Sequence, residues 1–190
     1  MLRAFKIFAI LVAGIALGLA ATWVTAICGT MGGSATDGPW HTSLYTGSSE
    51  GGPYLRAQIA VHGLLALSRE ETVYLYCSAP SDGTALDGNC MYHLEGRDLP
   101  TRCWSITAYG ADDFLIPNDA GRYSVSMNSV ARDADGRFKV TLSKAKAEGN
   151  WIPVAPGRFD LAVRLHNPQA DVIADPAHVA LPAIKKAGCE

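Results

Sequence analysis

The chain has 190 residues, of which 48% are hydrophobic and 18% charged, and its formal net charge is −2. This length accommodates one globular domain and little else. Its basic residues are scattered singly apart from Lys185 and Lys186, whereas binding to a phosphate backbone requires clustered basic side chains. Composition therefore argues against nucleic acid as a partner.

The first long feature is the uncharged, apolar segment 7–28. A transmembrane helix needs roughly 20 apolar residues, whereas the apolar part of a cleaved signal peptide has about 7–15. We therefore predict that residues 1–28 form an anchor in the lipid bilayer, with cleavage after the helix as the alternative. Arg3 and Lys6 precede the segment and no basic residue follows until Arg56, which places the N-terminus in the cytoplasm and the domain outside it.

The next segment, 29–52, is rich in Gly, Ser and Thr and is typical of a tether to a domain at residues 53–190. Because a flexible linker seldom needs a tryptophan, the alternative is that the segment around Trp40 adds a short strand or packs Trp40 onto the domain.

A helix is predicted from Pro53 to near Ser68, since proline suits the first turn. Apolar residues at spacings of three and four predict that one face of this helix is buried. These residues are Tyr54, Ala57, Val61, Leu64 and Leu65.

After Glu71 the apolar period changes to two, which indicates half-buried strands. In the last run, Phe159, Leu161, Val163 and Leu165 alternate with polar residues, so one face of that strand is predicted to be wet. Six strand-like runs separated by turn-forming residues predict a mainly β fold, an antiparallel sandwich-like domain with one short amphipathic helix. The runs are 72–77, 91–94, 103–109, 123–127, 137–142 and 158–166.

Cysteines in an exported domain would meet an oxidising compartment. Cys77 and Cys90 each lie in a β-like run flanking one loop, so we predict a disulfide between them; the other pairings with Cys103 and Cys189, and four free thiols, remain alternatives.

The sequence contains no motif for a metal, a cofactor or a catalytic triad. It has no CxxC, no HExxH and no GxSxG, and its paired acids lie in turns. We therefore predict no catalytic residue, no metal site and no cofactor.

Motifs along the domain resemble the bacterial domain-of-unknown-function family 1214. They include ETVYLY at 71–76, LDG at 86–88, CWSITAYG at 103–110, FLIPN at 114–118, RYS at 122–124 and NWIPVAPGRFDLAVRLHNP at 150–168. The resemblance covers residues 53–184 and implies an all-β sandwich-like domain behind one helix in a bacterial inner membrane, facing the periplasm. The family's role is not established, but its domain often accompanies that of the sister family 1254. The resemblance therefore implies a membrane-anchored sister-family protein as partner, and it leaves self-association open.

Polar and aromatic residues within these motifs are the candidates for ligand binding. Arg122 is suited to binding an anion, and asparagine beside tryptophan is suited to a sugar or another small polar ligand. The alternative is that these side chains bury an aromatic and tie loops together. The candidates are Trp104, Asn118, Arg122, Tyr123, Asn150 and Trp151.

Three functions follow from the sequence. The leading hypothesis is a non-catalytic envelope domain that works in protein–protein assembly. The second is a binding module for a small polar or carbohydrate-like ligand, and the third is an enzyme of unknown class.

Overall fold

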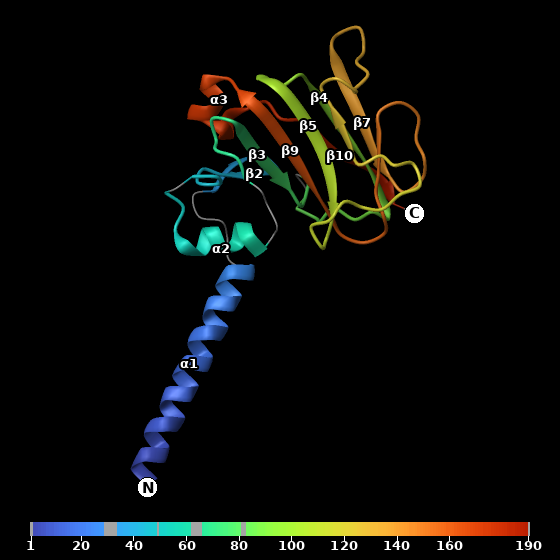
Figure 1. The fold of residues 1–190 in the computed structure, drawn as a ribbon. Helices are drawn as coiled ribbons and strands as arrows, with labels where there is room; N and C mark the ends of the chain where they lie inside the picture. The colour runs from blue at the N-terminus through green and yellow to red at the C-terminus, as the bar shows by residue number, and fades with distance from the viewer. Residues whose placement is uncertain (1, 29–33, 49, 62–65, 81–82, 190) are drawn as a thin grey trace.

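The computed structural model describes residues 2–28, 34–48, 50–61, 66–80 and 83–189. A long helix, α1 (Leu2–Cys28), projects from a β domain made of two facing sheets (Figure 1). Within the described residues, α1 is the one helix long and apolar enough to cross a membrane. No part of that span, Arg3–Ala26, is buried against the domain.

The larger sheet has six strands in the order β1-β2-β3-β9-β5-β6, and the smaller has four in the order β10-β4-β7-β8. All pairings are antiparallel except that of β7 with β8. The strands are β1 (Ser34–Asp37), β2 (Trp40–Ser43), β3 (Thr72–Cys77), β4 (Cys90–Arg97), β5 (Thr101–Gly110), β6 (Ser124–Ser126), β7 (Arg137–Ser143), β8 (Trp151–Pro153), β9 (Phe159–Pro168) and β10 (Ala183–Cys189). The short helices are α2 (Pro53–Val61), α3 (Ala170–Ala174) and the 3-10 turn η1 (Pro176–His178).

The core lies between the two sheets. The predicted alternation in β9 is confirmed, because Phe159, Leu161, Val163 and Leu165 are fully buried. Trp104 of the larger sheet packs against Phe138 of the smaller sheet, with ring centroids 4.9 Å apart. The predicted sandwich-like class and the six predicted strands are therefore confirmed.

Part of the segment predicted as a tether belongs to the larger sheet, as the alternative interpretation held. Strands β1 and β2 pair with each other, and His41 of β2 pairs with Tyr76 of β3. Trp40 is only 1% exposed, and its indole N–H donates to the carbonyl of Pro182 over 2.9 Å.

The predicted helix begins at Pro53 as expected but ends at Val61, and residues 66–68 are not helical. The prediction of its buried face is wrong for Tyr54 and Val61, which are exposed; Leu64 and Leu65 lie outside the described residues. The buried residues are instead Leu55 and Gln58. The reason is the contact of α2 with α1, where the Gln58 amide donates to the carbonyl of Thr25 over 3.0 Å.

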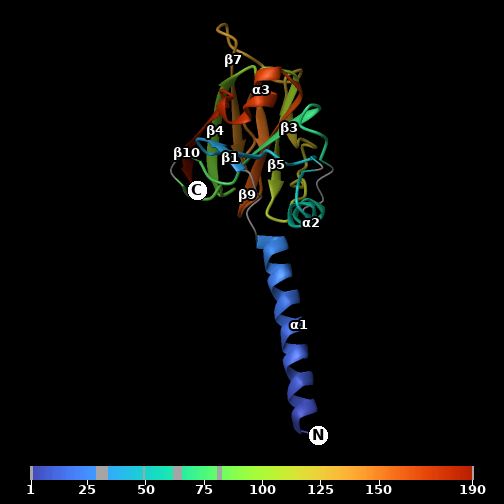
Figure 2. The same cartoon turned by 90° about the vertical axis from the view of Figure 1, so that its left-hand side faces the viewer.

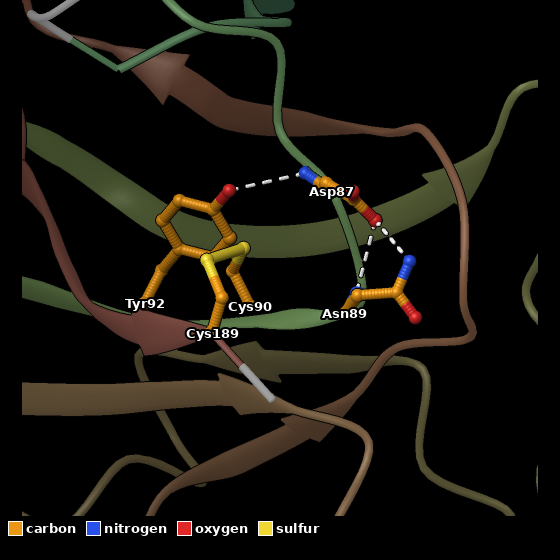
Figure 3. The surroundings of a disulfide bond; sticks show 5 residues. All are labelled: Asp87, Asn89, Cys90, Tyr92 and Cys189. Atoms are coloured by element: carbon orange, nitrogen blue, oxygen red, sulfur yellow. Dashed lines mark hydrogen bonds between the residues drawn. A yellow bond between two sulfur atoms is a disulfide. The ribbon is translucent and has the colours of Figure 1, made fainter.

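The predicted Cys77–Cys90 disulfide is contradicted, because Cys90 is bonded to Cys189 (Figure 3). Strand β10, which the sequence did not predict, pairs with β4 in a register that sets Cys189 opposite Cys90. Cys77 lies in the other sheet, fully buried and not bonded to another cysteine. Burial raises the pKa of its thiol to about 12, so the thiol stays protonated as a core group.

Candidate functional site

Two of the predicted ligand-binding residues are core tryptophans. Trp104 is 0% exposed, and its indole N–H donates to a carboxylate oxygen of Asp98 over 3.0 Å. Trp151 is also buried, and its indole N–H donates to the carbonyl and the hydroxyl of Ser143 over 3.2 and 3.1 Å. Both rings therefore contribute to packing, and neither presents a face to a ligand.

Asn150 holds a loop by three hydrogen bonds. Its amide nitrogen donates to the carbonyls of Ala131 and Lys139 over 2.7 and 3.0 Å, and its oxygen accepts from the Ala131 N–H over 2.7 Å. Because the Asn150 side chain is fully engaged, this residue fits the structural alternative for the predicted site.

An arginine ties the same loop, but it is Arg132. Its guanidinium donates to Asp98 over 2.6 and 3.1 Å and to the carbonyls of Met127 and Val130. The hydrogen bond from Arg132 is the largest cause that lowers the pKa of Asp98 below its ordinary value. Trp104, through Asp98, and Asn150 thus belong to one network that fixes residues 127–132.

The remaining candidates lie in a turn after β5. Asn118 closes it, since its side chain donates to the carbonyls of Ile116 and Arg122 over 3.0 and 2.8 Å and accepts the Arg122 N–H. The side chains of Arg122 and Tyr123 are exposed. Of the six predicted residues, only these two present their side chains freely to solvent.

A different group of polar side chains gathers on the outer face of the larger sheet. In a strand, alternate residues point to the same face, and the strand register places these side chains in adjacent rows. Tyr74 of β3 pairs with Arg164 of β9, and Tyr109 of β5 pairs with Asp160 of β9. We call this group the polar face. Its members are Tyr74, Tyr76, Thr107, Tyr109, Asp160 and Arg164.

Arg164 is the centre of the polar face. Its guanidinium donates to the Tyr109 hydroxyl over 2.7 Å and to the Thr107 hydroxyl over 3.4 Å. The guanidinium carbon lies 5.4 Å from the ring centroid of Tyr109 and 6.0 Å from that of Tyr74. Within the described part of the chain no carboxylate forms a salt bridge with Arg164. Its positive charge therefore has aromatic and hydroxyl neighbours and, among the described residues, no carboxylate within salt-bridge distance.

Two buried oxygens on the polar face have no hydrogen-bond partner, the Tyr76 hydroxyl and Oδ1 of Asp160, and the latter lies 3.7 Å from a guanidinium nitrogen of Arg158. Burial raises the pKa of Tyr76 to about 12, so its hydroxyl remains a donor at neutral pH. Its ring lies 6.0 Å from the ring of His41, whose pKa is lowered by burial. Buried polar groups are nearly always satisfied in folded proteins, so the Tyr76 hydroxyl is an unused hydrogen-bonding group on this face.

The chemistry of the polar face is that of recognition. Tyrosine hydroxyls and an arginine guanidinium offer hydrogen bonds and positive charge to an acidic group. Among the described residues, no group of three or more metal-binding side chains occurs. The sequence contained part of the signal, since alternation places Asp160 and Arg164 on one side of β9, but the register that brings the tyrosines beside them was not predictable.

An open depression of about 240 Å³ lies beside the Cys90–Cys189 disulfide. Small residues such as Gly88, Ala145 and Gly188 form much of its wall. Asp87, whose backbone N–H donates to the Tyr92 hydroxyl, stands near the disulfide in Figure 3. The depression therefore follows the turn geometry around the cross-link and gathers no set of convergent polar groups.

Comparisons with known proteins concern the family and the fold. A family described as "Protein of unknown function (DUF1214)" matches residues 71–170. The VPA0106 protein from Vibrio parahaemolyticus has a similar fold, with a TM-score of 0.61 and 24% identity over 73% of this chain and 36% of that chain. A putative uncharacterized protein from Burkholderia cenocepacia gives a TM-score of 0.41 and 18% identity over 61% of this chain and 29% of that chain. No curated protein matches. The chain thus spans about a third of the length of these solved structures.

Proposed function

The chain belongs to the DUF1214 family of proteins of unknown function, and from this premise we propose that it is a bacterial envelope protein whose β domain works in protein–protein assembly. In this proposal α1 anchors the chain in the inner membrane and the domain faces the periplasm. The partner is a membrane-anchored protein of the sister family 1254, which contacts the polar face.

The proposed topology is supported by α1 and by the disulfide. The span Arg3–Ala26 has no buried residue, so its apolar side chains need a lipid or protein surface to cover them. The basic residues Arg3 and Lys6 at its start favour a cytoplasmic N-terminus. The Cys90–Cys189 disulfide is typical of a protein outside the reducing cytoplasm.

Assembly through the polar face rests on one observation above all: Arg164, which forms no salt bridge among the described residues, lies with three half-buried tyrosines on the outer face of the larger sheet. Arginine and tyrosine are the residue types that dominate binding energy at protein interfaces. An extended sheet face suits a protein surface better than a small molecule, which usually binds in a deep pocket. We infer that a carboxylate of the partner pairs with Arg164.

The length of the solved relative agrees with a partner. The matching part of the Vibrio parahaemolyticus protein is 36% of its chain, so there the same fold is accompanied by further polypeptide. In the proposal a separate protein packs against this domain in place of the additional polypeptide that the longer chain contains.

The test is affinity purification of the tagged full-length protein from its native membrane, comparing Arg164→Ala with Arg122→Ala. Arg122 is the matched control, because it is an exposed arginine whose backbone alone closes the turn with Asn118. Loss of a hot-spot arginine weakens binding by about tenfold or more, so Arg164→Ala should lose the partner while Arg122→Ala retains it. Arg164→Lys keeps the charge but not the planar guanidinium, and it should rescue only partly.

The opposite pattern would favour the small-ligand function. If Arg122→Ala alone changes what is recovered, the exposed pair Arg122 and Tyr123 is the binding site, and the role of the polar face is rejected. Thermal unfolding of each variant shows whether a loss of partner reflects a lost contact or an unfolded domain.

A further inference from the structure

The exposed side of α2 is apolar. Tyr54 and Val61 are 49% and 55% exposed, and they lie seven residues apart, which in an α-helix places them on nearly the same face. Ala60 is also exposed, and the one charged residue of the nine, Arg56, is exposed about 160° away from Tyr54 around the helix. A short helix of a domain standing free in water would be expected to present polar residues on this side.

The contact between α2 and α1 fixes where this apolar side lies. Gln58 is buried, and its amide donates to the carbonyl of Thr25, which is in the last turn of the span Arg3–Ala26. The helix α2 therefore lies at the level where the apolar span ends. In Figure 1 it crosses above the end of α1, and in Figure 2 it is seen end-on beside that end.

A second apolar element lies at the same end of the domain. Strand β5 runs toward the end nearest α1, so the residues that follow Gly110 lie there too (Figures 1 and 2). Among them Phe114 is 73% exposed and Leu115 is 44% exposed. The apolar side chains that remain uncovered at this end thus come from two separate segments.

We propose that α2 is an interfacial helix that rests on the leaflet from which α1 emerges, with Tyr54 and Val61 among the lipid headgroups and upper acyl chains. Aromatic residues favour this depth, and short amphipathic helices bind there through buried apolar area. The inference rests on the proposed anchoring of α1 in a membrane. Its consequence is that the domain stands in a defined orientation, which presents the polar face at a fixed height above the bilayer.

Tryptophan quenching by brominated lipids tests this arrangement in the full-length protein reconstituted in liposomes. The background variant is Trp23→Phe, which removes the tryptophan of α1, while the other three tryptophans are buried in the domain. Tyr54→Trp adds the probe to α2. The matched control is Ala134→Trp in the exposed turn before β7, at the end of the domain farthest from α1 (Figure 2).

Brominated lipids should reduce the emission of the Tyr54→Trp protein relative to the background and leave the Ala134→Trp protein at the background level. If brominated lipids quench the Tyr54→Trp protein no more than the Ala134→Trp protein, the interfacial position of α2 is overturned, whether water, the domain or a second copy covers residue 54. The wild-type protein separates this failure from that of the anchor. If brominated lipids quench Trp23, α1 is in the bilayer; if they do not, the proposed membrane anchoring itself is wrong.

Discussion

Removing the Cys90–Cys189 cross-link should destabilise the domain strongly. We consider the variant Cys189→Ser, which leaves Cys90 in place and adds no bulk at the exposed end of β10. In β10 only Ile184 is buried, so this edge strand is held by its backbone pairing with β4 and by the covalent link more than by side-chain packing.

The magnitude follows from the length of chain that the disulfide closes. The two cysteines are 99 residues apart in sequence, and a cross-link that closes a loop of about 100 residues reduces the entropy of the unfolded chain by an amount worth about 4.7 kcal/mol at 25 °C. We therefore expect the free energy of unfolding to fall by about 4 kcal/mol, which is a large fraction of the stability of a typical domain.

The assay is urea unfolding of the detergent-solubilised full-length protein, followed by the fluorescence of its buried tryptophans. Cys103→Ser is the control, because Cys103 is half-buried and forms no disulfide. A loss of less than about 1 kcal/mol for Cys189→Ser, or an equal loss for the control, would refute the chain-entropy argument.

Three further predictions concern single side chains. Asn150→Ala removes three hydrogen bonds and should lower the free energy of unfolding by about 2 kcal/mol in the same urea assay, whereas Asn128→Ala, at an exposed position, should leave it nearly unchanged. Arg132 lowers the pKa of Asp98 in the folded state. The stability that this pair contributes is therefore present above the ordinary aspartate pKa of 3.8 and is lost as the pH falls through the lowered pKa of the folded state. The urea midpoint of Asp98→Asn should lack this dependence on acid pH. Tyr76→Phe removes a buried hydroxyl that makes no hydrogen bond, so it should raise the midpoint of thermal unfolding. If the hydroxyl serves the interface, the same variant should also recover less of the partner protein. A lowered midpoint would show instead that the hydroxyl is hydrogen-bonded in the folded domain.

The strands that the sequence predicted share a strong alternation of apolar and polar residues. Those that it missed lack this pattern. Trp151–Pro153 of β8 is buried on both sides, and β10 is exposed except at Ile184. Their positions in the sheet depend on pairing with β7 and β4, which is a long-range contact that local periodicity does not contain.

The error in α2 has a related cause. The spacing of Tyr54 and Val61 was interpreted as a core-facing side, since apolar periodicity shows that a face is apolar but not what covers it. In the structure the buried residues of the helix are Leu55 and Gln58, and Gln58 is covered where α2 meets α1. The spacing of Tyr54 and Val61 therefore fits an exposed apolar side of α2, which we propose rests on the lipid surface.

The candidate site was predictable only in part. Trp104 and Asn150 stand out in the sequence because they are large or polar residues within distinctive motifs, yet the structure gives them packing and loop-holding roles. Arg164 is one of the polar residues that alternate with the apolar residues of β9 in the sequence. Its importance depends on Tyr74 and Tyr109, which come from β3 and β5 and are brought to it by strand register.

Site-specific photo-crosslinking in native membranes shows whether the polar face contacts another membrane-anchored protein, as we propose. In one variant of the full-length protein a benzophenone amino acid replaces Tyr109, and in a control variant it replaces Ala134 in the turn before β7. If the polar face is the interface, position 109 should give one adduct with a single membrane-anchored protein, and position 134 should give none. Equal labelling from both positions, or no adduct from position 109, would contradict this proposal.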